Sequence, residues 1–138
     1  MPEFSIFSED FKEGEEIPKN CGYKHGNKKP VIGIKDIPDR TEGTTIIMDD
    51  PDAMGAVGKV WVHWLEYGNA DDEHVTDGKN DFGEIGYGGP APPDKRHTYI
   101  FKAYALDTAL DLKEGYSKQE LEDAMKGHII AEAKLTGT

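Results

Sequence analysis

Four short apolar runs, each bounded by turn-forming residues, constrain the fold of this chain more than any other feature. They cover residues 31–37, 44–48, 59–67 and 98–106, and most are rich in β-branched and aromatic residues. Gly, Pro, Asn or Asp stands near their ends, as is usual for strands of all-β proteins. The sequence therefore predicts a mainly β fold in which these four runs are strands.

One segment near the C-terminus has a helical pattern instead. Ser117 and Glu120 have the spacing of a capping box, and apolar residues follow them at helical intervals. We expect a helix over residues 118–126. We expect residues 128–135 to leave the helix near Ile130 and to enter a last strand.

The length and charge of the chain limit what it can be. With 138 residues it fits one domain, 1–138, and 27 acidic against 16 basic residues give a net charge of −11. Such a charge repels polyanions, so binding to nucleic acid or adsorption to anionic lipid is not expected. The acidic stretch 70–84 is predicted to be an exposed loop.

Cysteine content and hydropathy bear on the location of the protein. Cys21 is the only cysteine, which excludes an intramolecular disulfide and favours a reducing compartment. The N-terminus has no basic segment followed by a long apolar run, and no apolar run reaches the length of a membrane span. We therefore expect a cytoplasmic protein without stable membrane insertion.

Polar residues of unusual type occur at the ends of the predicted strands. Because side chains alternate along a strand, His63 is expected to share a face with Trp61, Leu65 and Tyr67. By the same rule Trp64 lies on the opposite face, where we expect it in the core.

A second histidine precedes the last of the four strands. His97 and Tyr99 are two residues apart and are expected to point the same way. If the strands of His63 and His97 are neighbours, both imidazoles open onto one pocket beside Tyr99. Asp50 and Asp52 are likewise two apart, across Pro51, and are expected to share a face.

A glycine- and proline-rich segment, 86–93, lies between these two strands. Gly88 and Gly89 allow close approach of the backbone, and their amides are predicted to form an anion-binding wall. Prolines at 90, 92 and 93 are predicted to stiffen this rim. The segment lacks the Gly-Lys-Ser/Thr ending of a phosphate-binding P-loop.

These residue types together indicate a ligand. Imidazole, phenol and amide groups donate hydrogen bonds to phosphate-like oxygens, whereas carboxylates repel them. Asp50 and Asp52 are therefore expected to charge or orient a histidine, or to accept from an ammonium group. A small anionic or zwitterionic ligand with both amine and phosphate, such as an ethanolamine phosphate head group, fits both the hydrogen-bond donors and the carboxylates.

In this order, the motifs resemble the phosphatidylethanolamine-binding protein family, which includes the Raf-kinase inhibitor proteins, and above all its shorter bacterial and archaeal branch. The resemblance rests on Asp-Pro-Asp-Ala at 50–53, Trp-x-His-Trp at 61–64, Gly-Tyr-Gly-Gly-Pro at 86–90, His-x-Tyr at 97–99, Tyr-Ala-Leu-Asp at 104–107 and the closing segment 127–138.

The resemblance implies an antiparallel Greek-key β-sandwich with a few short helices. It implies a binding or inhibitory protein rather than an enzyme, and often a homodimer. We expect no cofactor and no metal, because the spacing of possible ligands fits no standard metal signature. Two positions depart from the family pattern: Met54 stands where a proline is usual, and Thr98 where an arginine is usual. Carried over position by position, the ligand pocket comprises Asp50, Pro51, Asp52, Trp61, His63, Gly89, Pro90, His97 and Tyr99.

Two other functions are left open by the residues. A hydrolase could use Asp50, Asp52, His63 and His97 as acid and base or as ligands of a divalent metal. An inhibitor or modulator of a partner, such as a kinase or a protease, could use the acidic surface and the 70–84 loop. Outside the pocket, His25 and His128 are expected to be surface or structural residues, and Asp49 to belong to a turn.

Overall fold

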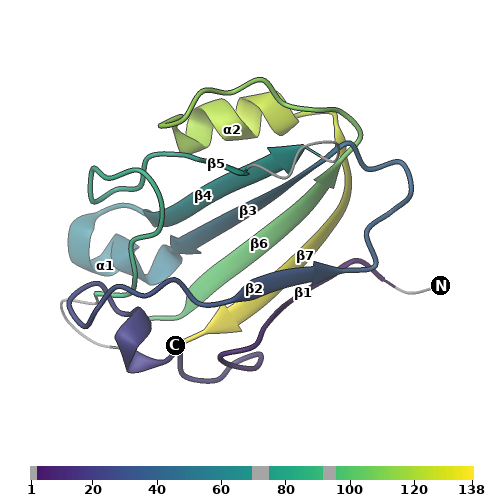
Figure 1. Ribbon diagram of the computed structural model, residues 1–138. Coiled ribbons are helices and arrows are strands. Elements are labelled where there is room, and N and C mark those ends of the chain that lie inside the picture. The colour runs from purple at the N-terminus through teal and green to yellow at the C-terminus, as the bar shows by residue number, and fades with distance from the viewer. Residues whose placement is uncertain (1–2, 70–74, 92–95) are drawn as a thin grey trace.

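The computed structural model describes residues 3–69, 75–91 and 96–138 (Figure 1). Two antiparallel sheets and a few short helices form the fold, which confirms the predicted class. The elements along the chain are β1 (Ser5–Ser8), η1 (Lys19–Cys21), β2 (Ile32–Lys35), β3 (Gly43–Asp50), η2 (Pro51–Ala53), α1 (Met54–Val57), β4 (Trp61–Asn69), β5 (Val75–Asp77), β6 (Tyr99–Leu106), α2 (Lys118–Met125) and β7 (Ile129–Gly137).

The larger sheet has five strands in the order β5-β4-β3-β6-β7. Strands β3, β4 and β5 follow one another as antiparallel neighbours, and β6 then returns to pair with β3. This order is that of a Greek key. The long β5–β6 connection contains the glycine- and proline-rich segment, so the topology itself brings that segment to the end of β4 and β6.

Two hydrophobic clusters cover the two faces of this sheet. On one face, Ile6 of β1 and the β2 isoleucines pack against Met48, Trp64 and Phe101, in what we call the sandwich cluster. On the other face, α2 and the segment before it pack against residues such as Leu65, in what we call the helix cluster. Figure 1 shows α2 and the β1–β2 sheet on separate sides of the larger sheet.

Helix α2 begins as its sequence predicts. The Ser117 hydroxyl accepts the Glu120 amide at 3.0 Å, and the Glu120 carboxylate accepts the Ser117 amide at 3.2 Å. Its end differs slightly from the prediction: the helix stops at Met125, and Gly127 then takes a positive φ of 83°. Residues 129–137 form one strand, so the expected helical continuation toward Ile130 is wrong.

The sequence did not predict β1 or β5, which have four and three residues. Within the supposed exposed loop 70–84, Asn80 is buried and its side chain bonds the Gly86 carbonyl, while 70–74 lie outside the described residues. In the described part of the chain, no helix has the length and apolar character needed to cross a membrane.

Candidate functional site

His63 owes its position to a β-bulge in β4. Met48 pairs with Trp64, but the next residue of β3, Asp49, pairs with Val62, which leaves His63 as an extra residue between them. A bulge of this kind reverses the alternation of the side chains that follow it. His63 and Trp64 therefore both face the sandwich cluster.

The bulge overturns the predicted alternation in β4. Leu65 and Tyr67 were expected on the face of His63, but they lie in the helix cluster on the opposite face. Trp61 and Trp64 were expected on opposite faces, yet both lie on the side of the sandwich cluster. The expectation that Trp64 belongs to the core is confirmed, because it is only 2% exposed.

Asp50 and Asp52 accept hydrogen bonds from the two residues that precede β6, His97 and Thr98. Asp50 Oδ2 lies 2.5 Å from His97 Nδ1, and its Oδ1 accepts the Asp52 amide at 3.0 Å. The Asp52 carboxylate accepts the Thr98 amide at 2.8 Å. Since a carboxylate can only accept, Nδ1 of His97 carries the proton, and the ring orientation is fixed by Asp50. Pro51, between the two aspartates, is exposed and opens η2.

The two imidazoles converge on Tyr99. The ring centroid of His63 lies 5.2 Å from that of Tyr99, and the ring centroid of His97 lies 6.3 Å from that of Tyr99. The geometric prediction that these sequence-distant histidines meet beside Tyr99 is confirmed. Both rings are deeply set, with His63 2% and His97 1% exposed. Both imidazoles are therefore buried beside Tyr99 rather than exposed on the surface.

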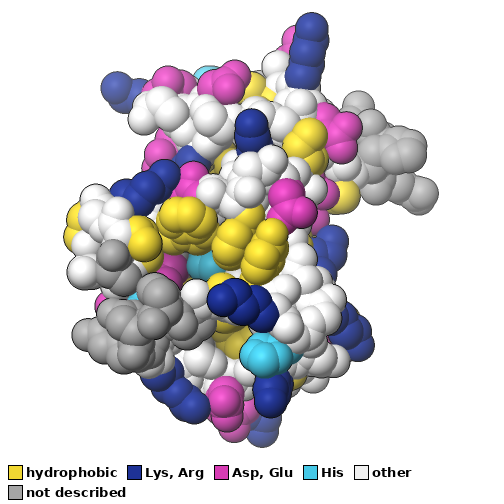
Figure 2. Space-filling model, turned by 90° about the vertical axis from the view of Figure 1, so that its left-hand side faces the viewer, with side chains coloured by type: hydrophobic (Ala, Val, Ile, Leu, Met, Phe, Trp, Pro, Cys, Tyr) yellow, Lys and Arg dark blue, Asp and Glu magenta, His cyan; other side chains and the backbone are white. Residues whose placement is uncertain are grey.

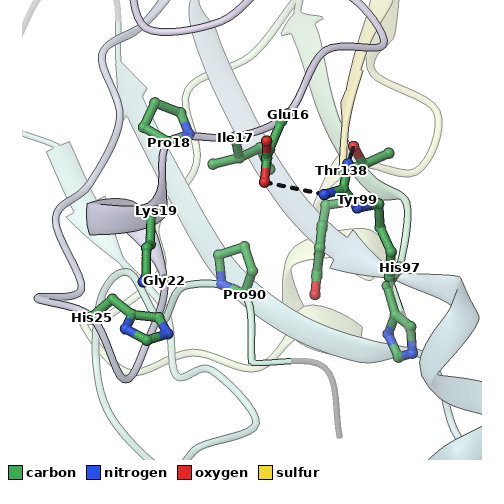
Figure 3. A pocket seen from close by; sticks show the side chains of 11 residues that line it. Glu16, Ile17, Pro18, Lys19, Gly22, His25, Pro90, His97, Tyr99 and Thr138 are labelled. Atoms are coloured by element: carbon green, nitrogen blue, oxygen red, sulfur yellow. Dashed lines mark hydrogen bonds and ion pairs between the residues drawn. The ribbon is translucent and has the colours of Figure 1, made fainter. Parts of the chain in front are cut away.

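A cavity of about 320 Å³ lies against His97 and Tyr99, and His63 is not part of its lining (Figure 3). Of the predicted residues, Pro90, His97 and Tyr99 line it, and Figure 3 shows Pro90 between His25 on one side and Tyr99 and His97 on the other. The rest of its lining is Glu16, Ile17, Pro18, Lys19, Gly22, His25, Arg96 and Thr138.

The charged residues of this cavity were not predicted. Glu16, Lys19 and Arg96 come from segments without strand or motif signals, and His25 was expected to have no part in the pocket. Arg96 is two residues before Thr98, the position where the family pattern has its arginine. A guanidinium is thus present at the rim although the expected position lacks one.

His63 is held in a neutral form. Its Nδ1 lies 2.6 Å from the Gly88 carbonyl oxygen, which accepts the ring N–H. Burial lowers the pKa of His63 below its ordinary value, although this hydrogen bond and the Asp50 carboxylate partly oppose the shift. At neutral pH the ring is therefore uncharged, and its Nε2 is an acceptor.

The proposed anion-binding wall of backbone amides is wrong. The Gly88 amide donates to the His63 carbonyl at 2.8 Å, and the Gly89 amide donates to the Asn27 side chain at 2.7 Å. These glycines serve packing instead: a Cβ on Gly88 would meet the ring of Phe82, and one on Gly89 would meet the backbone of Cys21. Pro92 and Pro93, the other predicted rim residues, lie outside the described residues.

Aromatic side chains surround Trp61 beside the histidines. Tyr23 stacks on Phe82 with centroids 3.9 Å apart, and Trp61 meets the same ring edge-on at 5.4 Å. His63 also contacts Phe82, at 5.6 Å. The buried Nε1 of Trp61 has no hydrogen-bond partner among the described residues. Figure 2 shows hydrophobic side chains gathered beside a recess in which histidine atoms are visible.

Asp49 lies on the other face of the sheet and is not a turn residue. It is 2% exposed, and Lys102 and Lys118 each approach its Oδ2 to 3.1 Å. The carboxylate therefore links β3 to β6 and to the first turn of α2. Because it faces away from the cavity, it belongs to the framework.

Comparison with known proteins gives a consistent result. The family model described as phosphatidylethanolamine-binding protein matches residues 7–138. A UPF0098 protein of Chlamydia muridarum is 37% identical over 144 residues, covering 96% of each chain, and one of Methanothermobacter thermautotrophicus is 38% identical, covering 92% of each.

Two solved structures have the same fold. One is a putative phosphatidylethanolamine-binding protein homologue, CT736 of Chlamydia trachomatis, with a TM-score of 0.89 and 34% identity. The other is YbcL of Escherichia coli, described as a new member of the mammalian family, with a TM-score of 0.88 and 27% identity. Each comparison covers 99% of this chain and 97% of the other.

Proposed function

The chain belongs to the phosphatidylethanolamine-binding protein family, and from this premise we propose that it is a binding protein for small phosphate-bearing ligands. The observation that carries the proposal is the convergence of His63 and His97 on Tyr99, with His97 and Tyr99 on the wall of a cavity. Phosphate oxygens accept hydrogen bonds from a phenol and from an imidazolium, which carries a proton on both ring nitrogens.

The charge around the cavity supports an anionic ligand. The whole chain carries a net charge of −11. By contrast, the charged side chains of the cavity lining are Lys19 and Arg96 against Glu16. A local excess of basic side chains on an acidic protein attracts a small anion while the rest of the surface repels polyanions.

We propose binding rather than hydrolysis because Asp50 and Asp52 have structural roles. Asp50 orients His97 and caps η2, and Asp52 accepts the Thr98 amide. Within residues 3–69, 75–91 and 96–138, no group of three or more His, Cys, Asp and Glu residues could hold a metal ion.

The proposal includes a cytoplasmic location and assembly into a homodimer. A cytoplasmic location agrees with the single cysteine, Cys21, which is a buried free thiol. A homodimer and an inhibited kinase or protease stay predictions from the family resemblance.

Titration with phosphoethanolamine tests the proposed function. We expect the imidazole NMR signals of His63 and His97 to shift together and saturably, because His97 lines the cavity and His63 contacts Tyr99, which also lines it. His128, which is paired with Asp107 and half exposed elsewhere on the surface, is the internal control and should not move. Unchanged signals of both site histidines at millimolar ligand would reject the proposal.

The pH dependence of anion binding gives a second prediction. Burial lowers the pKa of His63, so the free protein holds it neutral at pH 7; a bound anion favours the imidazolium and raises that pKa. Binding then takes up a proton, and affinity rises as pH falls from about 7.5 toward the lowered pKa, by up to roughly tenfold per pH unit. Sulfate is the suitable probe, because it stays dianionic over this range.

Calorimetry in two buffers of different ionisation enthalpy measures this proton uptake. The exposed His25 lines the cavity, whereas His63 lies behind Tyr99, so the measurement is repeated with His25→Gln, which should keep the effect, and with His63→Gln, which should lose it. A pH dependence that survives in His63→Gln would assign the proton to another group.

A further inference from the structure

An ion pair spans the rim of the cavity. Glu16 Oε1 lies 3.2 Å from Arg96 Nη2, and both residues line the cavity (Figure 3, dashed line). The two residues are 80 positions apart in the chain, so only the fold brings them together. The carboxylate therefore lies where an anionic ligand would meet the guanidinium.

Both partners are attached to well-anchored neighbours. The Ile17 amide donates to the Thr138 carbonyl at 2.8 Å, and the Thr138 amide donates to the Glu15 carbonyl at 3.0 Å, so the backbone on each side of Glu16 is tied to the end of the chain. Ile17 itself is 4% exposed. Arg96 directly precedes His97, whose ring is bound to Asp50. The pair is thus a defined feature of the rim.

We propose that Glu16 is a specificity-determining residue of the cavity, because its carboxylate competes with anionic ligands for the guanidinium of Arg96. This inference rests on the proposed function, since it concerns the same cavity. Glu16 lowers the affinity for any small anion, and most for those with the highest negative charge.

The ion pair between Glu16 and Arg96 is weak enough for a ligand to displace. The side chains of Arg96 and Glu16 are 64% and 68% exposed, and one nitrogen–oxygen contact joins them. Exposed pairs of this kind are weak, worth about a two- to five-fold change in an equilibrium constant. A phosphate group can make two parallel hydrogen bonds with a guanidinium, which are stronger. A ligand can therefore displace Glu16, but at a measurable loss of affinity.

A double-mutant cycle with inorganic phosphate as the probe tests the inference. Dissociation constants are measured at low ionic strength for the wild type, Glu16→Gln, Arg96→Gln and the double variant. We expect Glu16→Gln to tighten phosphate binding about two- to five-fold and Arg96→Gln to weaken it. Glu9→Gln, which removes one exposed charge outside the cavity lining, is the matched control and should change little.

The effect of Glu16→Gln in the Arg96→Gln background distinguishes competition for Arg96 from direct repulsion of the ligand by Glu16. If Glu16 acts through Arg96, Glu16→Gln has little effect once Arg96 is glutamine. An equal gain in both backgrounds would mean simple through-space repulsion and would overturn the inference, as would equal affinities of the wild type and Glu16→Gln. Absence of phosphate binding in all four proteins would overturn the proposed function as well, whereas binding seen only after Glu16→Gln would support the competition.

Discussion

His97→Ala is expected to lower the free energy of unfolding by about 3–5 kcal/mol, because it leaves the Asp50 carboxylate buried without its cationic or donor partner. Asp50 is 3% exposed and His97 1%, and their contact is 2.5 Å. The hydrogen bond that Asp50 keeps among the described residues, from the Asp52 amide, cannot replace the imidazole. Urea denaturation followed by circular dichroism measures the loss.

The chain contains a matched control for this experiment. His128 and Asp107 form a second histidine–aspartate pair with a contact of 2.9 Å, but their side chains are 46% and 41% exposed. His128→Ala should cost less than about 1 kcal/mol, because water solvates the aspartate that remains. Similar small losses in both variants would show that burial does not set the cost.

A second substitution separates the buried charge from simple loss of packing. If the unpaired carboxylate causes the instability, Asp50→Ala combined with His97→Ala costs less than the sum of the two single substitutions. The double variant also keeps the experiment informative if His97→Ala alone does not fold. An additive double variant would contradict the assignment of the loss to the unpaired aspartate.

Patterns local in the chain were sufficient to predict most of the strands and helix α2, whereas the Greek-key arrangement was predicted from the family resemblance. The four strands and α2 were found from apolar runs and from the Ser117–Glu120 capping box. Strands β1 and β5 were missed because three or four residues are too few to set a period. They become strands by pairing with β2 and β4, which is a property of the tertiary structure.

In the site, too, residues within local motifs were predicted, whereas contacts that depend on the tertiary structure were not. His63, His97 and Tyr99 were predicted from their motifs, and they do converge. The bulge at His63 was not predicted, because strand register depends on the partner strand as well as on its own sequence. Glu16 and Arg96 carry no motif and meet only through folding, so no pattern in the sequence indicated that they line the cavity.

Gly89→Ala is the second change with a large expected effect, because it forces apart two segments that form the cavity wall. An added Cβ would meet the backbone of Cys21 and, at 3.0 Å, the nitrogen of Tyr23. That nitrogen donates to the Pro90 carbonyl at 2.9 Å, so the two segments are hydrogen-bonded at the point of the clash. Backbone atoms cannot turn aside as side chains do.

We expect Gly89→Ala to cost about 1–3 kcal/mol of unfolding free energy and to weaken phosphoethanolamine binding. Gly55→Ala is the control: nothing lies within 4 Å of its Cβ, and alanine favours helix α1, so stability should stay the same or rise by up to about 1 kcal/mol. Denaturation and ligand titration of both variants make the comparison. If Gly89→Ala bound ligand and unfolded like the wild type, the close contact between Gly89 and Cys21 would have no part in shaping the cavity.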